Sequence, residues 1–259
     1  MERHSLGQPR TGTAAPGAQL LPYIDQLTRE VHKPTLLRRI TRERFAGIGS
    51  REGAVTLLRV EVEVGGDVHL RHGADVAAAE WISGWSFEDL VNFGPSGFGA
   101  YARLRFIPDP SRPGQDEAEV ELPADHPTDL EQARRALDHL AGYTATAHHC
   151  YFCIWDGYGD LNLSATPGEP TVLHLPDRSY TLMEGPLEAL GTWEIDLGRG
   201  GPLVPPALIW PADHTWCFVK DVDPHWAGIG ASTEAIRQLL DDPALDIVTA
   251  DPHDPQPYY

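Results

Sequence analysis

The chain has 259 residues, of which 41% are hydrophobic, with 7 Trp, 8 Tyr and 7 Phe. This composition excludes an intrinsically disordered protein, and the length is sufficient to bury a sizeable core. The formal net charge of -18 excludes nucleic-acid binding by the acidic body, because such binding depends on Lys and Arg displacing counterions from phosphates.

The charge is unevenly distributed along the chain. Residues 1–45 carry eight basic and four acidic side chains, so the remainder is more acidic than the whole. We expect this basic segment to dock on the acidic body of its own chain. Contact with nucleic acid could be made only through the same segment.

The apolar residues of the sequence do not form the runs that are typical of a membrane-spanning helix or a signal peptide. No run reaches the roughly 20 apolar residues of a membrane-spanning helix, and residues 1–18 lack the apolar core of a signal peptide. Three cysteines, an odd number, do not make a disulfide framework and favour a reducing compartment. We therefore predict a cytoplasmic protein without a membrane span.

The N-terminal third is predicted to hold a tail, helices and a hairpin. Residues 1–18 are a disordered tail, and residues 20–48 have apolar side chains at helical spacing, interrupted by Pro34. Residues 54–64 alternate like a half-exposed strand, and Gly65-Gly66 would turn the chain into a return strand at 68–71. We expect one domain over 19–259, in which 19–80 forms a subdomain.

The middle of the chain holds two helical signals and a central strand. Ser86 opens a capped helical turn over 86–90, after a loop at 75–85. Thr128 and Glu131 have the spacing of a capping box and open a helix to 142. Two strand-like stretches lie at 101–107 and 148–155, and a Gly-rich turn ends the second, which we take as the central strand.

Short strands dominate the remainder. Helical signals occupy 185–190 and 232–240, and residues 228–230 are read as a connecting turn or an anion site. Strands are predicted at 161–163, 171–175, 179–183, 207–210 and 215–222, with an edge strand at 245–248 and a Pro-rich tail over 251–259. Neighbouring strands joined by short turns favour an α+β fold with a mainly antiparallel sheet and a few flanking helices.

Several segments of the chain are distinctive as a set, namely 81–85, 92–98, 100–104, 150–158, 206–218 and 223–228. Together they resemble a family of uncharacterised actinobacterial proteins, and the resemblance covers roughly residues 80–259. That resemblance implies a bacterial cytoplasmic protein, and it supplies no catalytic residue because the family has no assigned activity.

Cysteine and histidine spacing permits a zinc site. His149, Cys150 and Cys153 could combine with His214 and Cys217 as zinc ligands. Residues three apart on a strand point to opposite faces, however, and buried thiols pack as small hydrophobic groups. We favour this second interpretation and predict no metal and no cofactor.

Acidic turn residues suggest a metal-dependent hydrolase as an alternative function. Asp156, Asp160, Asp213 and His214 could converge on Mg²⁺ or Ca²⁺, or act as an acid and base. Asp and Gly are also common turn residues that bond their own backbone. We therefore assign these positions no catalytic role in the preferred interpretation.

Aromatic residues near turns suggest binding. Tyr158 lies between two glycines and Trp226 follows His225, so we predict these three at an exposed surface. Together with the acidic body they favour a non-catalytic protein that binds a basic protein partner, as an immunity or antitoxin-like inhibitor would. A third alternative is a small-ligand-binding protein with an apolar pocket on the aromatic strand.

Overall fold

The computed structural model describes residues 38–44, 56–62 and 69–259, apart from 160, 164–165, 167, 176, 194–196 and 199–202. The chain divides into two compact units, residues 1–66 and 67–259, and each is described by itself. The predicted tail over 1–18 and the predicted turn at 65–66 lie outside the described residues.

The first unit contains a pair of antiparallel strands, β1 (Arg38–Arg44) and β2 (Thr56–Val62). The predicted strand over 54–64 is confirmed for the described residues 56–62, but its predicted partner and the predicted helix over 38–44 are wrong. β2 pairs with β1 along its full length, whereas the short strand β3 (Arg71–His72) pairs with β7.

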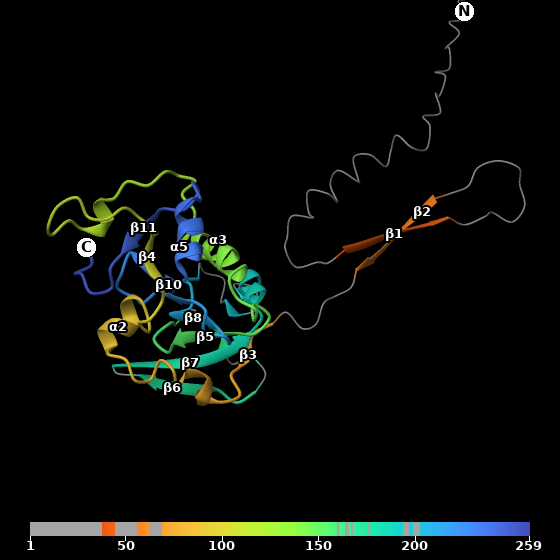
Figure 1. The fold of residues 1–259 in the computed structure, drawn as a ribbon, viewed down its shortest axis with the longest axis horizontal. Coiled ribbons are helices and arrows are strands. Elements are labelled where there is room, and N and C mark those ends of the chain that lie inside the picture. Colours follow the sequence, from red (N-terminus) through yellow and green to blue (C-terminus); the bar gives the residue numbers. More distant parts are fainter. Residues whose placement is uncertain are drawn as a thin grey trace, which may run out of the picture. The chain divides into compact units, whose positions relative to one another are not determined.

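The second unit is built on a sheet of nine strands within the described ranges, all paired antiparallel. This confirms the predicted α+β class. The strand order is β11-β4-β10-β9-β8-β5-β7-β3, and β6 also pairs with β7 (Figure 1). The strands after β3 are β4 (Ala100–Arg105), β5 (Cys150–Trp155), β6 (Thr171–Leu175), β7 (Arg178–Gly185), β8 (Leu208–Pro211), β9 (Cys217–Val219), β10 (Trp226–Ala231) and β11 (Ile247–Ala250).

Three α-helices whose bounds lie within the described residues of this unit begin where the capping residues predict. α2 (Phe87–Asn92), α3 (Asp129–Ala141) and α5 (Thr233–Leu240) are each preceded by a hydroxyl side chain that accepts a backbone N–H bond. The capping box at Thr128 is complete, since Glu131 also accepts from the Thr128 backbone. Short 3₁₀ turns are η2 (Val76–Ala79), η3 (Glu117–Glu119) and η5 (Leu187–Gly191).

The sheet has a core on each face. α3 and α5 bury Leu130, Leu137 and Ile236 against one face, where Phe152 and Ile229 point. The other face carries a second cluster that includes Leu90 of α2 and Trp210. None of the helices in the described ranges is long and apolar enough to span a membrane.

β10 is a second strand, besides β1, that the sequence analysis did not predict. Residues 228–230 form part of a strand buried on both faces, and the predicted turn is therefore wrong. Gly228 and Gly230 hid the strand pattern because they supply no side chain. Their role is steric: a Cβ on Gly228 would lie 1.8 Å from the Asn92 carbonyl oxygen, and one on Gly230 would lie 2.3 Å from the Phe98 ring. The glycines let α2 and the loop after it lie directly on the sheet.

Replacing Gly228 with Ala should therefore displace α2. We expect the free energy of unfolding to fall by roughly 3 kcal/mol or more, the upper part of the range for overpacked sites. Gly84→Ala is the matched control, because a Cβ there meets no atom within 4 Å. Chemical denaturation of both variants tests this, and equal stabilities would contradict the close packing of α2 on β10.

Candidate functional site

α2 and the C-terminal tail (residues 251–259) lie side by side and enclose a groove on the second unit (Figure 1). Two adjoining hollows of 330 and 210 Å³ form it, and both are lined by Glu88, Asn92, Pro252 and His253. We call it the α2–tail groove. Its lining comes from residues within 87–96, from Tyr101 and from residues within 252–258.

The lining of the α2–tail groove is acidic and aromatic. No Lys or Arg belongs to the described residues that line it. Carboxylates and aromatic ring faces both attract cations, so the groove suits a positively charged ligand. The carboxylates are Glu88, Asp89 and Asp254, and the rings are Phe87, Phe93, Tyr101 and Tyr258.

The acidic side of the groove follows from the start of α2. Ser86 caps the helix by accepting from the Asp89 N–H, and Glu88 and Asp89 occupy its first turn. Carboxylates are favourable there because the N-terminal end of a helix carries partial positive charge. The sequence that starts α2 therefore also places two negative charges on the groove. Glu88 and Asp254 are both exposed.

The tail forms the second wall because three hydrogen bonds fasten it. The Trp226 indole N–H donates to the Pro257 carbonyl oxygen at 3.0 Å. The Tyr258 hydroxyl donates to the Asn92 side-chain oxygen at 2.5 Å, which ties the tail to α2. The Tyr259 hydroxyl donates to the Pro108 carbonyl oxygen.

Ring contacts support the same tail. Trp226 stacks on Phe93 with centroids 5.5 Å apart and contacts Tyr258 at 5.9 Å. His225 meets Tyr259 edge to face at 4.7 Å. His225 and Trp226 therefore form the surface on which the tail packs, and we call these two residues the seat of the tail.

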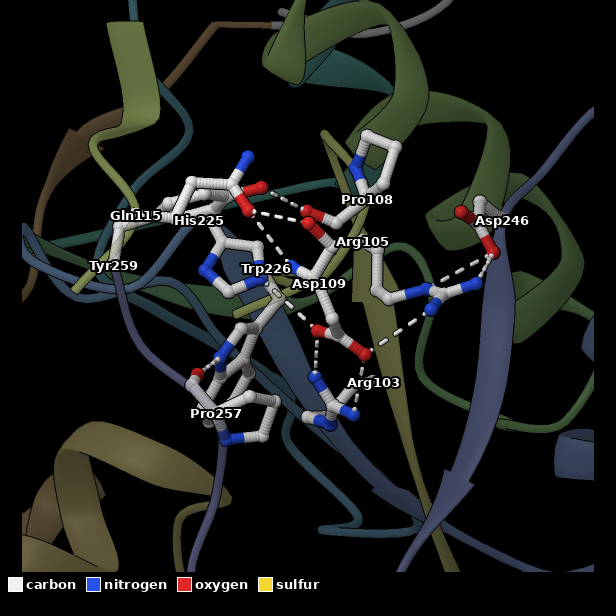
Figure 2. A network of polar contacts seen from close by, with 11 residues as sticks. Arg103, Arg105, Pro108, Asp109, Gln115, His225, Trp226, Asp246, Pro257 and Tyr259 are labelled. Atoms are coloured by element: carbon white, nitrogen blue, oxygen red, sulfur yellow. Dashed lines mark hydrogen bonds and ion pairs between the residues drawn. The ribbon is translucent and has the colours of Figure 1, made fainter. Parts of the chain in front are cut away.

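Below this seat, the Asp109 carboxylate gathers three side chains (Figure 2). Arg103 binds it through two nitrogens, at 2.6 and 3.1 Å. Arg105 binds at 3.1 Å and His225 Nε2 lies 3.0 Å away. Arg105 extends the network to Asp246 at 2.6 Å. The network thus joins β4, the start of β10 and the residue that precedes β11.

These contacts shift the ionisation of the network. Burial raises the pKa of Asp109, but hydrogen bonds from Arg103, His225 and Arg105 outweigh it and hold the pKa well below its ordinary value. Burial lowers the pKa of His225 by more than its bond to Asp109 raises it. A neutral His225 that donates its Nε2–H to Asp109 is consistent with this arrangement.

Two of the three residues predicted at an exposed surface are buried. Trp226 is 1% exposed and His225 is 6% exposed, so their predicted exposure is wrong. The reason is that Trp226 begins the buried strand β10, His225 directly precedes it, and the tail packs on both. Tyr158 is half-buried, with its ring edge on Trp155 at 5.5 Å, and burial raises its pKa. A binding role for these residues remains a prediction.

The proposed hydrolase residues do not converge. Asp156 follows β5 and Asp213 follows β8, and these strands run antiparallel with Cys150 opposite Pro211. The two carboxylates therefore lie at opposite ends of the strand pair, and the expectation that they meet is wrong. Asp160 lies outside the described residues.

Asp213 is also engaged in holding the chain. It accepts hydrogen bonds from Thr144, from the Ala145 N–H and from Thr215. Burial raises its pKa, but these bonds outweigh that effect and lower it. The neighbouring His214 stacks on Trp81 with centroids 4.2 Å apart. Both residues therefore have structural partners.

The candidate zinc ligands are dispersed. Cys150 packs in the core under α3, whereas Cys153 and Cys217 pack in the cluster on the opposite face. His149 lies 3.7 Å from Glu184. Among the described residues no three His, Cys, Asp or Glu side chains form a metal-binding group. Burial raises the pKa of Cys150 to about 12 and raises those of Cys153 and Cys217 as well, which disfavours the thiolate that zinc needs.

A third hollow, of 530 Å³, lies elsewhere on the second unit. Its lining includes Phe106, Leu122, Pro243 and Leu245. It does not involve β5, where an apolar ligand pocket was predicted. Its position therefore does not correspond to the predicted small-ligand site.

Sequence reasoning missed the residues that make the α2–tail groove. The sequence predicts the capped turn at Ser86 and the Pro-rich tail separately, but it does not indicate that the two meet. The pair of tyrosines in the Pro-rich segment indicates only that the tail packs on some surface of the protein, because aromatic rings favour burial. Asp109 gave no signal, because it resembles any turn aspartate between prolines.

Comparison of the chain with protein-family models, with curated proteins and with solved structures finds no match. The resemblance to uncharacterised actinobacterial proteins therefore remains a prediction. Functional argument rests on the geometry of this chain.

Asp109→Asn should destabilise the protein at neutral pH. Loss of the charged hydrogen bonds should lower the free energy of unfolding by roughly 2 kcal/mol. Because the pKa of Asp109 is depressed in the folded state, its stabilisation is present above the unfolded pKa and is lost as pH falls through the folded pKa. The difference between wild type and variant should thus shrink below about pH 4.

Denaturation measured against pH tests this prediction, with exposed Asp156→Asn as the control. We expect the control to unfold like the wild type at every pH. A constant difference between wild type and Asp109→Asn down to low pH would contradict the charged role of Asp109.

Chelation should leave the melting temperature unchanged, and elemental analysis should find no stoichiometric metal. The physical reason is that the candidate thiols favour their protonated form and Asp213 is occupied by hydrogen bonds. One metal per chain, with a lower melting temperature in chelator, would contradict this interpretation.

Proposed function

We propose that this protein is a non-catalytic interaction protein that binds a basic protein partner, as an immunity or antitoxin-like inhibitor does. The observation that carries the proposal is the α2–tail groove, which combines exposed carboxylates and aromatic rings without a basic side chain among its described lining. Such a surface complements Lys or Arg side chains of another protein.

The wider charge distribution supports the same partner chemistry. Residues 69–259 carry thirty acidic and ten basic side chains. Many of the described arginines already pair with carboxylates of their own chain, so they offer little positive charge to a partner. These are Arg71, Arg103, Arg105, Arg112, Arg135, Arg178 and Arg237.

The acidic surface also affects the rate of association with a partner and the binding of nucleic acid. A negative field accelerates encounter with a basic protein and repels nucleic-acid phosphates. An inhibitor gains from fast association because its target must be intercepted before it acts. A cytoplasmic location fits the free, buried cysteines Cys150, Cys153 and Cys217.

The proposal is tested by identifying the partner and reconstituting the complex. Crosslinking with mass spectrometry in the producing cells names candidates, and calorimetry on the purified pair measures affinity at several salt concentrations. We expect a basic partner, and an affinity that falls roughly tenfold or more from low to physiological ionic strength as exposed charges are screened. A neutral or acidic partner, or an affinity insensitive to salt, would overturn the proposal.

A further inference from the structure

The contacts of Arg178 indicate which kind of cation suits the residues next to the α2–tail groove. The Arg178 guanidinium carbon lies 5.2 Å from the Phe87 ring centroid and 5.4 Å from the Trp155 ring centroid. Its Nη2 lies 3.3 Å from Asp221 and 3.8 Å from Asp223. A guanidinium is thus held between two rings and two carboxylates. A planar, weakly hydrated cation suits this environment better than a compact ammonium does.

The α2–tail groove begins at the same ring. Phe87 belongs both to the Arg178 contact and to the groove lining. Tyr258 belongs to the tail wall, and Glu88 and Asp254 belong to the same lining. The groove therefore repeats the combination that surrounds Arg178, with aromatic faces beside carboxylates.

The local field around the groove is strongly negative. Burial raises the pKa of Tyr258, and the carboxylates of Glu88, Asp221 and Asp223 raise it further. Asp221 is 3% exposed, and its Oδ1 accepts no hydrogen bond from the described residues.

We propose that the α2–tail groove recognises an arginine side chain of the basic partner, with the guanidinium against Phe87 and Tyr258 and paired with Glu88 or Asp254. This inference rests on the proposed function and specifies that the groove recognises arginine side chains of the partner. Lysine carries the same charge but lacks the planar fork that stacks on rings and pairs with two carboxylate oxygens. The groove should therefore distinguish the two side chains.

Titration of the full chain with two blocked peptides tests this inference. One peptide carries two arginines in a glycine background, and the other carries lysines at the same positions. We expect the arginine peptide to bind about fivefold tighter at equal salt, the order of one cation–π contact. Equal affinity for the two peptides would overturn arginine recognition.

Charge-neutralising variants locate the site. Glu88→Gln combined with Asp254→Asn should weaken the arginine peptide about tenfold, because both exposed carboxylates line the groove. Glu169→Gln combined with Glu188→Gln removes the same charge from exposed positions outside the groove lining and should change affinity less than twofold.

The outcomes separate this inference from the proposed function. Equal weakening by the two double variants would overturn the groove as the binding site, while a salt-dependent complex with the basic protein partner would still stand. The same holds if neither peptide binds although the protein partner does. Absence of a basic protein partner would overturn the proposed function itself.

Discussion

The contacts of the Asp109 carboxylate are the interaction on which the α2–tail groove depends. This carboxylate holds Arg103, Arg105 and His225 together, and His225 with Trp226 forms the seat of the C-terminal tail. The tail is one wall of the α2–tail groove. The shape of that groove therefore depends on the Asp109 network, which holds His225 beneath the tail residue Tyr259. A carboxylate with three cationic or hydrogen-bonding partners is compensated despite partial burial, which makes it a fixed point for the segments around it.

The position of α2, the other wall of the groove, depends on a steric constraint. Gly228 and Gly230 remove side chains from one face of β10, so Asn92 and Phe98 can approach the strand backbone. The same close approach lets Phe93 stack on Trp226 and lets Asn92 accept from Tyr258. Both walls therefore depend on β10. Its glycines admit α2, and its first residue Trp226 receives the tail.

Local signals allowed prediction of the fold elements but not of their partners. The Ser86, Thr128 and Ser232 caps predicted the helices because each cap acts within one turn. β10 was missed since a strand buried on both faces with two glycines shows no alternation. The pairing of β2 with β1 and the separation of Asp156 from Asp213 depend on strand order and direction, which neighbouring residues do not encode. The groove was missed for the same reason, because its walls are far apart in sequence.

Hydrogen–deuterium exchange of the full chain, with and without the basic partner, tests whether the α2–tail groove is the binding site. We expect slower exchange on binding over residues 87–96 and 251–258, which form the two walls of the groove. Little change is expected in the acidic turn around Glu117 and Glu119, which lies outside the groove lining. Protection confined to that turn, with both walls unchanged, would contradict binding in the groove.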